Sequence, residues 1–216
     1  MKELFKFFIS FFIMTSLSFA EEVKVFDFTK QELENLKIKK VRGADNKTDY
    51  SIGNNENGNF LKAVANNAAS GLGKEIKIDL NKTPFLNITW KVEKDLKGID
   101  ERSKKGHDYA ARVFVVKKTG VTPLSNRAMN YVFSSNEDTN ASHPSPYTKK
   151  SIDYVLATTK DHLNEWVTVK VNVKEHFKKF HDLDLDEING VAIMADTDNS
   201  KLSSISYYQN IYFSAD

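Results

Sequence analysis

The stretch WVTVKVNV (166–173) alternates between two kinds of side chain. Valine fills every second position from 167 to 173, and polar residues fill the positions at 168, 170 and 172. A repeat of two places the valines on one face of a β-strand and the polar residues on the other. The stretch therefore predicts a half-buried strand, with Trp166 at the head of its polar face.

Eight further segments are short, rich in β-branched and aromatic residues, and separated by turn residues such as Asn and Gly. They are 60–65, 72–80, 86–93, 109–117, 129–135, 152–159, 190–196 and 206–214. Many short strands at such spacing are typical of an all-β sandwich or barrel. Helical signals are few: Thr29 and Glu32 have capping-box spacing, and 173–181 predicts one more short helix. We expect an all-β fold with one or two short peripheral helices.

The N-terminus has the pattern of a secretory signal peptide. Lys2 and Lys6 precede a 13-residue apolar run, and Ser18 and Ala20 provide small residues before a cut at Glu21. The alternative, an uncleaved membrane anchor, needs about 20 apolar residues. We therefore expect residues 1–20 to be a signal peptide, and residues 21–216 to form one β-sandwich domain exported to the periplasm. The sequence contains no second apolar segment, so we expect no membrane span in the mature protein.

Composition excludes several classes of function. The chain contains no cysteine, so a disulfide, a lipoprotein anchor and a cysteine nucleophile are all excluded. Its formal net charge is +2, without the clustered Lys and Arg that a nucleic-acid partner requires. Neither a GxSxG nor an HExxH motif occurs, and no glycine-rich loop for phosphates is present. Catalysis is therefore not the primary expectation, and no cofactor is predicted.

Arg112 stands inside the apolar segment YAARVFVVK (109–117). A strand that is apolar on both faces is covered on both, and a buried guanidinium then needs a carboxylate partner. By alternation Asp108 shares its side, and Glu93, Asp100 and Glu101 are further candidates. Two interpretations remain open: an internal ion pair that ties a loop to the sheet, or a group on the floor of a cleft whose planar donor fork binds a ligand.

Other candidates surround this strand in the sequence. The long irregular segments 94–108 and 136–150 flank it, and loops of that length are often functional. Trp90 is expected in the core by alternation, whereas Trp166 could offer a stacking surface. The candidate ligand-binding residues are Lys91, Asp100, Glu101, Arg102, Asp108, Arg112, Tyr131, Tyr147 and Trp166.

The sequence also contains a candidate metal site. Asp196 and Asp198 lie two residues apart in MADTDNSK (194–201), beside Asn199 and Ser200. Hard oxygen ligands at such spacing suit Ca²⁺, although the glycine and the glutamate of an EF-hand loop are missing. The alternative is a polar turn that closes a hairpin.

The chain resembles the bacterial exported family known as domain of unknown function 3047 (DUF3047). The resemblance covers nearly all of the mature chain and is most specific at GHDYAARVFV (106–115) and VAIMADTDN (191–199). It implies a galactose-binding-like jelly-roll β-sandwich, similar to carbohydrate-binding modules. Such folds often have an acidic residue before the last apolar stretch; here Gln209 and Asn210 take that place, which counts against a structural calcium site there.

The resemblance and the aromatic and charged candidates together favour a non-catalytic protein that binds a polysaccharide or another envelope component. In such a jelly roll Arg112 is expected on the concave face, in a cleft with Asp108, Lys91 and Tyr131. One alternative is a glycan hydrolase or lyase that uses acids from 93–108 with His107 or Tyr131. Another is an envelope protein-interaction module that uses a sandwich edge or the 136–150 loop.

Overall fold

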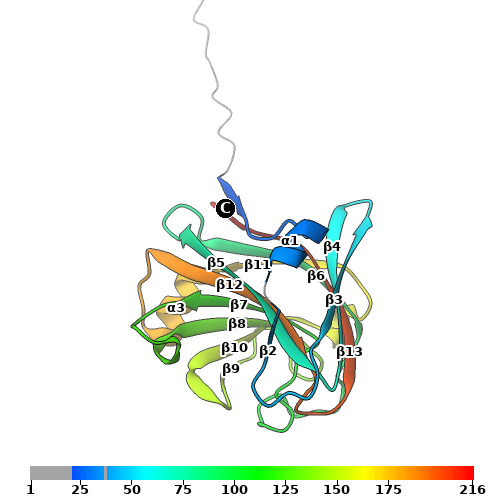
Figure 1. The fold of residues 1–216 in the computed structure, drawn as a ribbon. Coiled ribbons are helices and arrows are strands. Elements are labelled where there is room, and N and C mark those ends of the chain that lie inside the picture. The colour runs from blue at the N-terminus through cyan, green and yellow to red at the C-terminus, as the bar shows by residue number, and fades with distance from the viewer. Residues whose placement is uncertain (1–20, 37) are drawn as a thin grey trace, which may run out of the picture.

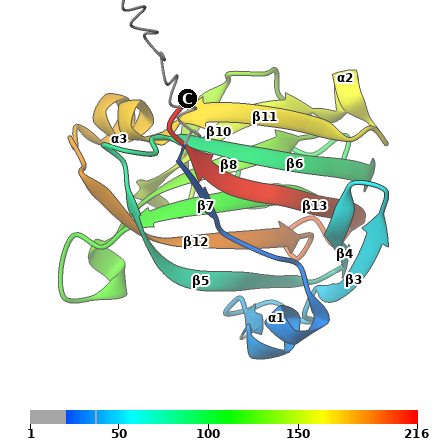
Figure 2. The same ribbon diagram turned by 90° about the horizontal axis from the view of Figure 1, so that it is seen from above.

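Two β-sheets lie face to face in the computed structural model, which describes residues 21–36 and 38–216 (Figure 1). The six-stranded sheet has the order β11 (Val167–Asn172), β6 (Phe85–Lys94), β13 (Ser203–Ser214), β4 (Gly58–Asn66) and β3 (Asp49–Asn55), with β1 (Glu22–Lys24) paired to β13. The seven-stranded sheet has the order β2 (Ile38–Lys40), β5 (Ala69–Asp79), β12 (Glu187–Asp196), β7 (Ala111–Lys117), β8 (Arg127–Ser134), β10 (Thr148–Thr158) and β9 (Ser142–Ser145). Figure 2 shows the strands of the two sheets running in roughly the same direction.

The jelly-roll-type β-sandwich expected from the sequence is confirmed, and each of the nine predicted segments contributes a strand. The 136–150 segment, expected to be irregular, contains β9 and the start of β10. Strand β10 pairs parallel to β8, whereas its pairing with β9 is antiparallel. The predicted signal peptide lies outside the described residues.

The core fills the space between the sheets, as the alternation of WVTVKVNV predicts. Val167 of β11 lies opposite Trp90 of β6, and the Trp90 side chain is fully buried against Phe133 of β8. On β7, Ala111, Val113 and Val115 face this core. Arg112 and Phe114 therefore point the other way, to the outer face of the seven-stranded sheet.

Three short α-helices of the described residues lie at the edges: α1 (Lys30–Asn35), α2 (Thr159–His162) and α3 (Val173–His181). The predicted helix start is confirmed, because the Thr29 hydroxyl accepts a hydrogen bond from the Glu32 amide at 3.1 Å. The Glu32 carboxylate accepts from the Phe28 amide at 2.8 Å, one residue before the position that a capping box uses. The bounds of α3 match the predicted 173–181 segment, whereas the single turn of α2 was not expected. None of the helices in the described part of the chain is long and apolar enough to cross a membrane.

One face of α3 covers the seven-stranded sheet with a cluster of rings. The His176 ring packs against Tyr154 at 4.4 Å and Phe180 at 5.4 Å between centroids. Burial, with a smaller contribution from Lys179, lowers the pKa of His176 to about 4. The folded protein therefore keeps this ring neutral well below pH 6, where the unfolded chain is protonated.

The free energy of unfolding is expected to depend on pH through His176. Because its folded pKa is depressed, stability is complete above pH 6.5 and is lost as pH falls toward 4. The ring is partly exposed, so we expect this loss to reach only about 1–2 kcal/mol. Urea unfolding at pH 7 and pH 4.5 should show a smaller pH effect in His176→Phe than in the wild type. Equal pH effects in both proteins would contradict the prediction.

Candidate functional site

A cavity of about 520 Å³ lies on the outer face of the seven-stranded sheet. Its floor consists of side chains from four neighbouring strands: Arg112 and Phe114 of β7, Asn130 of β8, Asp153 of β10, and Met194 and Asp196 of β12. Residues from both edges of the sheet form its walls. These are Val41–Gly43 after β2 and the Ser145–Thr148 turn between β9 and β10. The cavity therefore extends across the sheet between these two edges.

Arg112 forms a two-pronged ion pair with Asp196. Its Nε donates to Asp196 Oδ1 at 2.8 Å, and its Nη2 donates to Asp196 Oδ2. Both side chains are only 3% exposed. The guanidinium also lies over the rings of Tyr109 and Phe114, at 4.9 and 5.5 Å from their centroids. The expected carboxylate partner is thus present, and it comes from a residue that the sequence suggested only as a metal ligand.

Asp108 is not the partner of Arg112, contrary to the sequence prediction. Strand β7 begins only at Ala111, so the alternation that placed Asp108 beside Arg112 does not extend back to it. Its carboxylate instead accepts hydrogen bonds from the Asn199 side-chain amide at 2.8 Å and the Ser200 backbone at 2.6 Å. Asp108 thereby fixes the loop between β12 and β13.

Three carboxylates, Asp108, Asp196 and Asp198, have oxygen atoms within 4.8 Å of one another. Two of them are already engaged, because Asp196 holds Arg112 and Asp108 holds amide donors of the β12–β13 loop. A cation bound here would share two of its three carboxylates with these partners. Burial, followed by the neighbouring Asp108, raises the pKa of Asp198, which lines the cavity.

A second polar network centres on Asp153, which is 1% exposed. One of its oxygens lies 2.7 Å from His107 Nε2, and the other accepts from the Asn130 amide at 2.5 Å. Burial is the main cause that lowers the pKa of His107. His143 lies beside the same carboxylate, with its Nδ1 3.7 Å from Asp153 Oδ2. Asp153 thus orients a neutral imidazole at the cavity wall.

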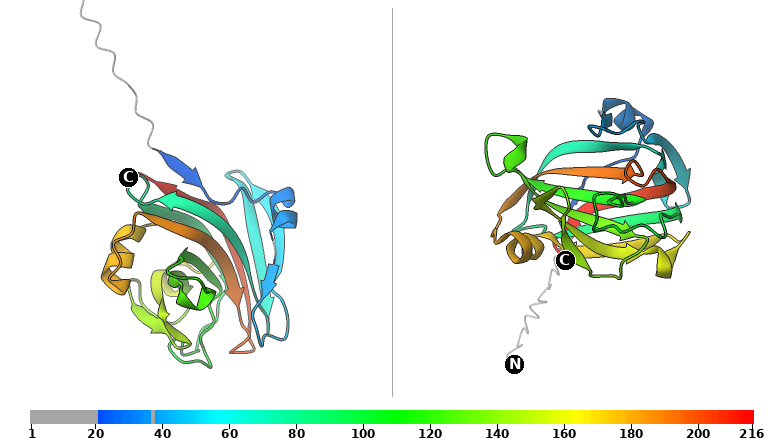
Figure 3. Two further views of the ribbon diagram at one scale, coloured as in Figure 1. Left: turned by 60° about the vertical axis from the view of Figure 1, so that its left-hand side comes forward. Right: turned by 90° about the horizontal axis from the view of Figure 1, so that it is seen from below.

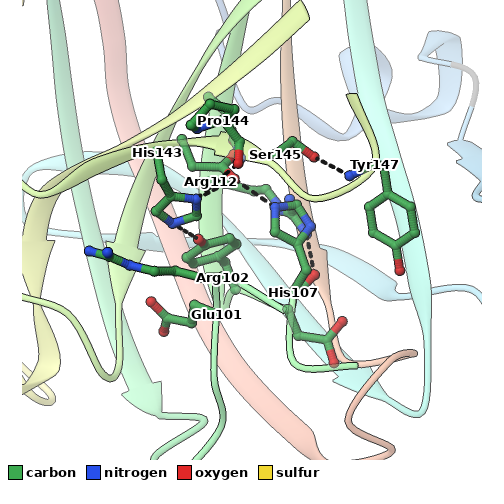
Figure 4. Close-up of polar contacts among 12 residues, drawn as sticks. Glu101, Arg102, His107, Arg112, His143, Pro144, Ser145 and Tyr147 are labelled. Atoms are coloured by element: carbon green, nitrogen blue, oxygen red, sulfur yellow. Dashed lines mark hydrogen bonds and ion pairs between the residues drawn. The ribbon is translucent and has the colours of Figure 1, made fainter. Parts of the chain in front are cut away.

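Tyr147 closes one end of the cavity. Its hydroxyl donates to Asn199 Oδ1 at 2.6 Å, with the Lys104 carbonyl oxygen as a second, more distant acceptor at 3.0 Å. The β9–β10 turn therefore contacts the β12–β13 loop and the segment before β7. The Tyr147 ring packs edge-on to His107 at 5.6 Å. Figure 4 shows Tyr147, His107 and His143 gathered around Arg112. The Tyr147 and His107 rings therefore form the wall at this end of the cavity.

Asp100, Glu101 and Arg102 lie beside this site and do not line the cavity. The buried Glu101 accepts from the Ser134 hydroxyl at 2.5 Å and the Ser135 amide at 2.9 Å, and burial raises its pKa. Arg102 pairs with Glu137 at 2.6 Å on the surface. Exposed Asp100 accepts from the Arg102 amide. These residues hold the 95–108 segment to the end of β8.

Lys91 and Trp166 lie on the outer face of the other sheet, so the expectation that Lys91 shares a cleft with Arg112 is wrong. There the Trp166 ring packs on Phe60 and Tyr207, with centroids 6.0 and 5.9 Å away. The Lys91 ammonium lies 4.6 Å from the Tyr207 centroid. This cluster is on the opposite surface of the sandwich from the cavity.

Tyr131 is also absent from the cleft, because its position on β8 faces the core, where the side chain is fully buried. The expectation that it lines the cleft with Arg112 is wrong for this reason. Its hydroxyl has no hydrogen-bond partner among the described residues. Burial raises the pKa of Tyr131 well above its usual value.

Removing that hydroxyl should therefore cost nothing. We expect Tyr131→Phe to unfold at the same denaturant concentration as the wild type or higher, because an unpaired buried polar group is itself costly. Tyr208→Phe is the matched control: the Tyr208 hydroxyl donates to the Met194 carbonyl at 2.7 Å and accepts from the Arg112 amide. This control should lose about 1–2 kcal/mol. A comparable loss of stability in Tyr131→Phe would contradict the prediction that the Tyr131 hydroxyl is unpaired.

The sequence reasoning missed Phe114, Asn130, Asp153, Met194 and Arg42, which line the cavity. A usable signal existed for one of them. Asp153 is the only charged residue in IDYVLATT (152–159), and Arg112 is likewise a charged residue with apolar neighbours in its own segment. The other four carry no such signal, because their proximity depends on the pairing of strands that are distant in the sequence.

Comparison with solved structures shows a shared fold. A family 30 carbohydrate-binding module of a cellulosomal cellulase from Clostridium thermocellum has a TM-score of 0.51 at 7% identity, covering 91% of this chain and 98% of that chain. A xyloglucanase domain of NopAA from Sinorhizobium fredii has a TM-score of 0.43 at 10% identity, covering 77% of this chain and 92% of that chain.

No curated protein matches the sequence. One family model does, over residues 34–212, which span strands β2 to β12 and most of β13. The matched range includes every residue that lines the cavity. The chain therefore belongs to the family described as protein of unknown function (DUF3047).

Proposed function

We propose that the protein binds a glycan, without transforming it, in the cavity on the outer face of the seven-stranded sheet. The observation that carries the proposal is the combination of aromatic rings and fixed polar groups around this cavity. Tyr147 and Phe114 offer ring surfaces, while the accessible side chains of Arg42, Ser151 and Asp198 offer hydrogen-bonding groups. Carbohydrates need both, because their C–H faces pack on rings and their hydroxyls need donors and acceptors.

The cavity is also held in place before any ligand arrives. Arg112 is fixed by Asp196, and Asp153 is fixed by His107 and Asn130. A site that needs no ordering loses less free energy on binding. The shared fold with a module that is named as carbohydrate-binding supports the same proposal.

The test is a thermal-shift screen of residues 21–216 against xyloglucan, xylan, soluble cellulose derivatives, alginate and peptidoglycan. A ligand that binds only the folded state raises the melting temperature. Calorimetry with the glycan that binds should show that Tyr147→Ala loses at least about tenfold in affinity, equal to about 1.4 kcal/mol. Trp166→Ala removes an aromatic ring from the opposite sheet and is the matched control. Wild-type protein that binds none of these glycans, or equal losses in both variants, would contradict the proposal.

A second function, a glycan lyase or hydrolase, is favoured by the pair formed by His107 and Asp153. A carboxylate that orients a neutral imidazole is the arrangement of a general base. Chromatography of each bound glycan after long incubation separates the two functions. Shorter products that disappear in His107→Gln would establish catalysis, whereas unchanged glycan supports binding alone.

We also propose that the protein is exported to the periplasm and that cleavage follows Ala20. The pattern of residues 1–20, with Ser18 and Ala20 before the expected cut, supports this proposal. Mass spectrometry of the protein from a periplasmic extract should give the mass of a chain that begins at Glu21. A mass that retains Met1–Ala20 would refute cleavage.

A further inference from the structure

A second cavity, of about 360 Å³, lies on the same outer face of the seven-stranded sheet. Two strands of the first cavity's floor, β7 and β12, also form the floor of this cavity. They contribute Val116 of β7, and Gly190 and Ala192 of β12. Gly73 of β5 completes it. The end of α1 and the start of the β7–β8 connection form its rim, and Figure 3 shows that connection protruding in green from the sandwich.

The two floors are continuous. On β7 the outward positions run from Arg112 and Phe114 in the first cavity to Val116 in the second. On β12 they run from Asp196 and Met194 to Ala192 and Gly190 in the same direction. No outward position separates the cavities on either strand. The seven residues from Gly190 to Asp196 are six steps apart along the strand and span about 20 Å, at roughly 3.3 Å per step.

The closed end of the first cavity sets the direction in which a long ligand would extend. Tyr147 joins Asn199 and the Lys104 carbonyl at the end where β7 begins. The second cavity lies at the opposite end of the same strands. A ligand too long for the first cavity therefore extends over Ala192 and Gly73.

The second cavity carries polar groups at its rim. Lys39 of β2 is exposed there, and its ammonium makes no ion pair with any residue in the described part of the chain. On the other side, Lys118 pairs with Glu75 at 3.2 Å. Charged groups above an uncharged floor can bind hydroxyl groups while the floor contacts C–H surfaces.

We propose that the ligand is a linear glycan that occupies both cavities with several consecutive sugar units. This proposal rests on the glycan binding proposed above and specifies the class of ligand. The ligand is an extended chain, in place of a single sugar or a short branch. Each unit over the second cavity adds contacts, so affinity rises with chain length until both cavities are filled.

The test measures the affinity of a disaccharide, a tetrasaccharide and a hexasaccharide of β-1,4-linked glucose or xylose by calorimetry. The blocking variant is Gly73→Phe. A Cβ at this position meets only Ala192 Cβ, at an ordinary 3.9 Å, so the new ring can enter the cavity without backbone strain. Ala192→Phe blocks the same place from the neighbouring strand. Thr168→Phe, at an exposed position of the other sheet, is the matched control.

We expect wild-type affinity to rise from disaccharide to hexasaccharide. Gly73→Phe and Ala192→Phe should lose about tenfold toward the hexasaccharide and keep their affinity for the disaccharide within about twofold. Thr168→Phe should match the wild type for all three. Equal wild-type affinity for all lengths, or equal losses at every length, would overturn the two-cavity proposal and leave glycan binding intact. Wild-type protein that binds none of the three, nor any polysaccharide of the screen, counts against glycan binding itself.

Discussion

Replacing Asp196 by alanine is expected to lower the free energy of unfolding by about 3–5 kcal/mol. The change leaves the Arg112 guanidinium, which is 3% exposed, without its carboxylate partner. A buried unpaired charge is among the most costly defects in a folded protein. Asp196 also accepts a hydrogen bond from the Tyr109 backbone amide at 3.2 Å, so the substitution removes a contact to the loop before β7 as well. Urea unfolding followed by circular dichroism gives the measurement.

Asp138→Ala is the matched control for this prediction. Asp138 pairs with Lys160 at 3.4 Å, but its side chain is 87% exposed, and such surface pairs contribute at most about 1 kcal/mol. The double variant Arg112→Met with Asp196→Leu removes both charges and should recover more than half of the loss. If Asp196→Ala lowers the free energy of unfolding no more than Asp138→Ala does, the buried Arg112 guanidinium does not depend on Asp196 for its stability.

The same double variant separates the two roles that the sequence left open for Arg112. A folded protein with both charges removed keeps the sheet and loses the guanidinium at the cavity floor. Retained glycan affinity would assign Arg112 a structural role. A loss of affinity without a loss of fold would assign it a contact with the ligand.

Trp90→Ala is expected to destabilise the protein by about 3–5 kcal/mol. The Trp90 side chain is fully buried between the sheets, and its ring lies 5.5 Å from that of Phe133. Truncation removes a large apolar surface and leaves a cavity that the two sheets cannot close. Thermal and urea unfolding should both show the loss.

Trp166→Ala is the comparison for Trp90→Ala, because Trp166 is the only other tryptophan of the chain. Its side chain is 36% exposed and contacts Phe60 and Tyr207 from one side. We expect a loss of about 1 kcal/mol, since one exposed aromatic contact contributes about that much. Similar losses in the two variants would show that alternation assigns their environments incorrectly.

The environments of the two tryptophans were predictable from the sequence for a simple reason. Alternation in LNITWKVE (86–93) and WVTVKVNV (166–173) depends only on neighbours along one strand. The same local rule fails at Asp108, where the strand stops before the pattern does, and at Lys91, where it gives the face of a strand but not which sheet the strand joins.

For the candidate site, the sequence supplied Arg112 and Tyr147 and, by the same signal, could have supplied Asp153. A lone charge in an apolar strand shows that a partner must exist, because an unpaired buried charge is too costly. It does not say which partner. Asp196 lies 84 residues from Arg112, and Asp153 lies 46 residues from His107.

The sequence by itself determined the all-β class of fold, the start of α1, the bounds of α3, the inward faces of β6 and β11 and the need for a carboxylate beside Arg112. Each of these follows from spacing within a few residues. Only the tertiary structure decided which carboxylate that is, and that Arg112, Asp153 and Tyr147 share one cavity while Lys91 and Trp166 lie on the opposite face. These outcomes depend on the order and register of strands in two sheets, which pairing between distant segments sets and local spacing does not.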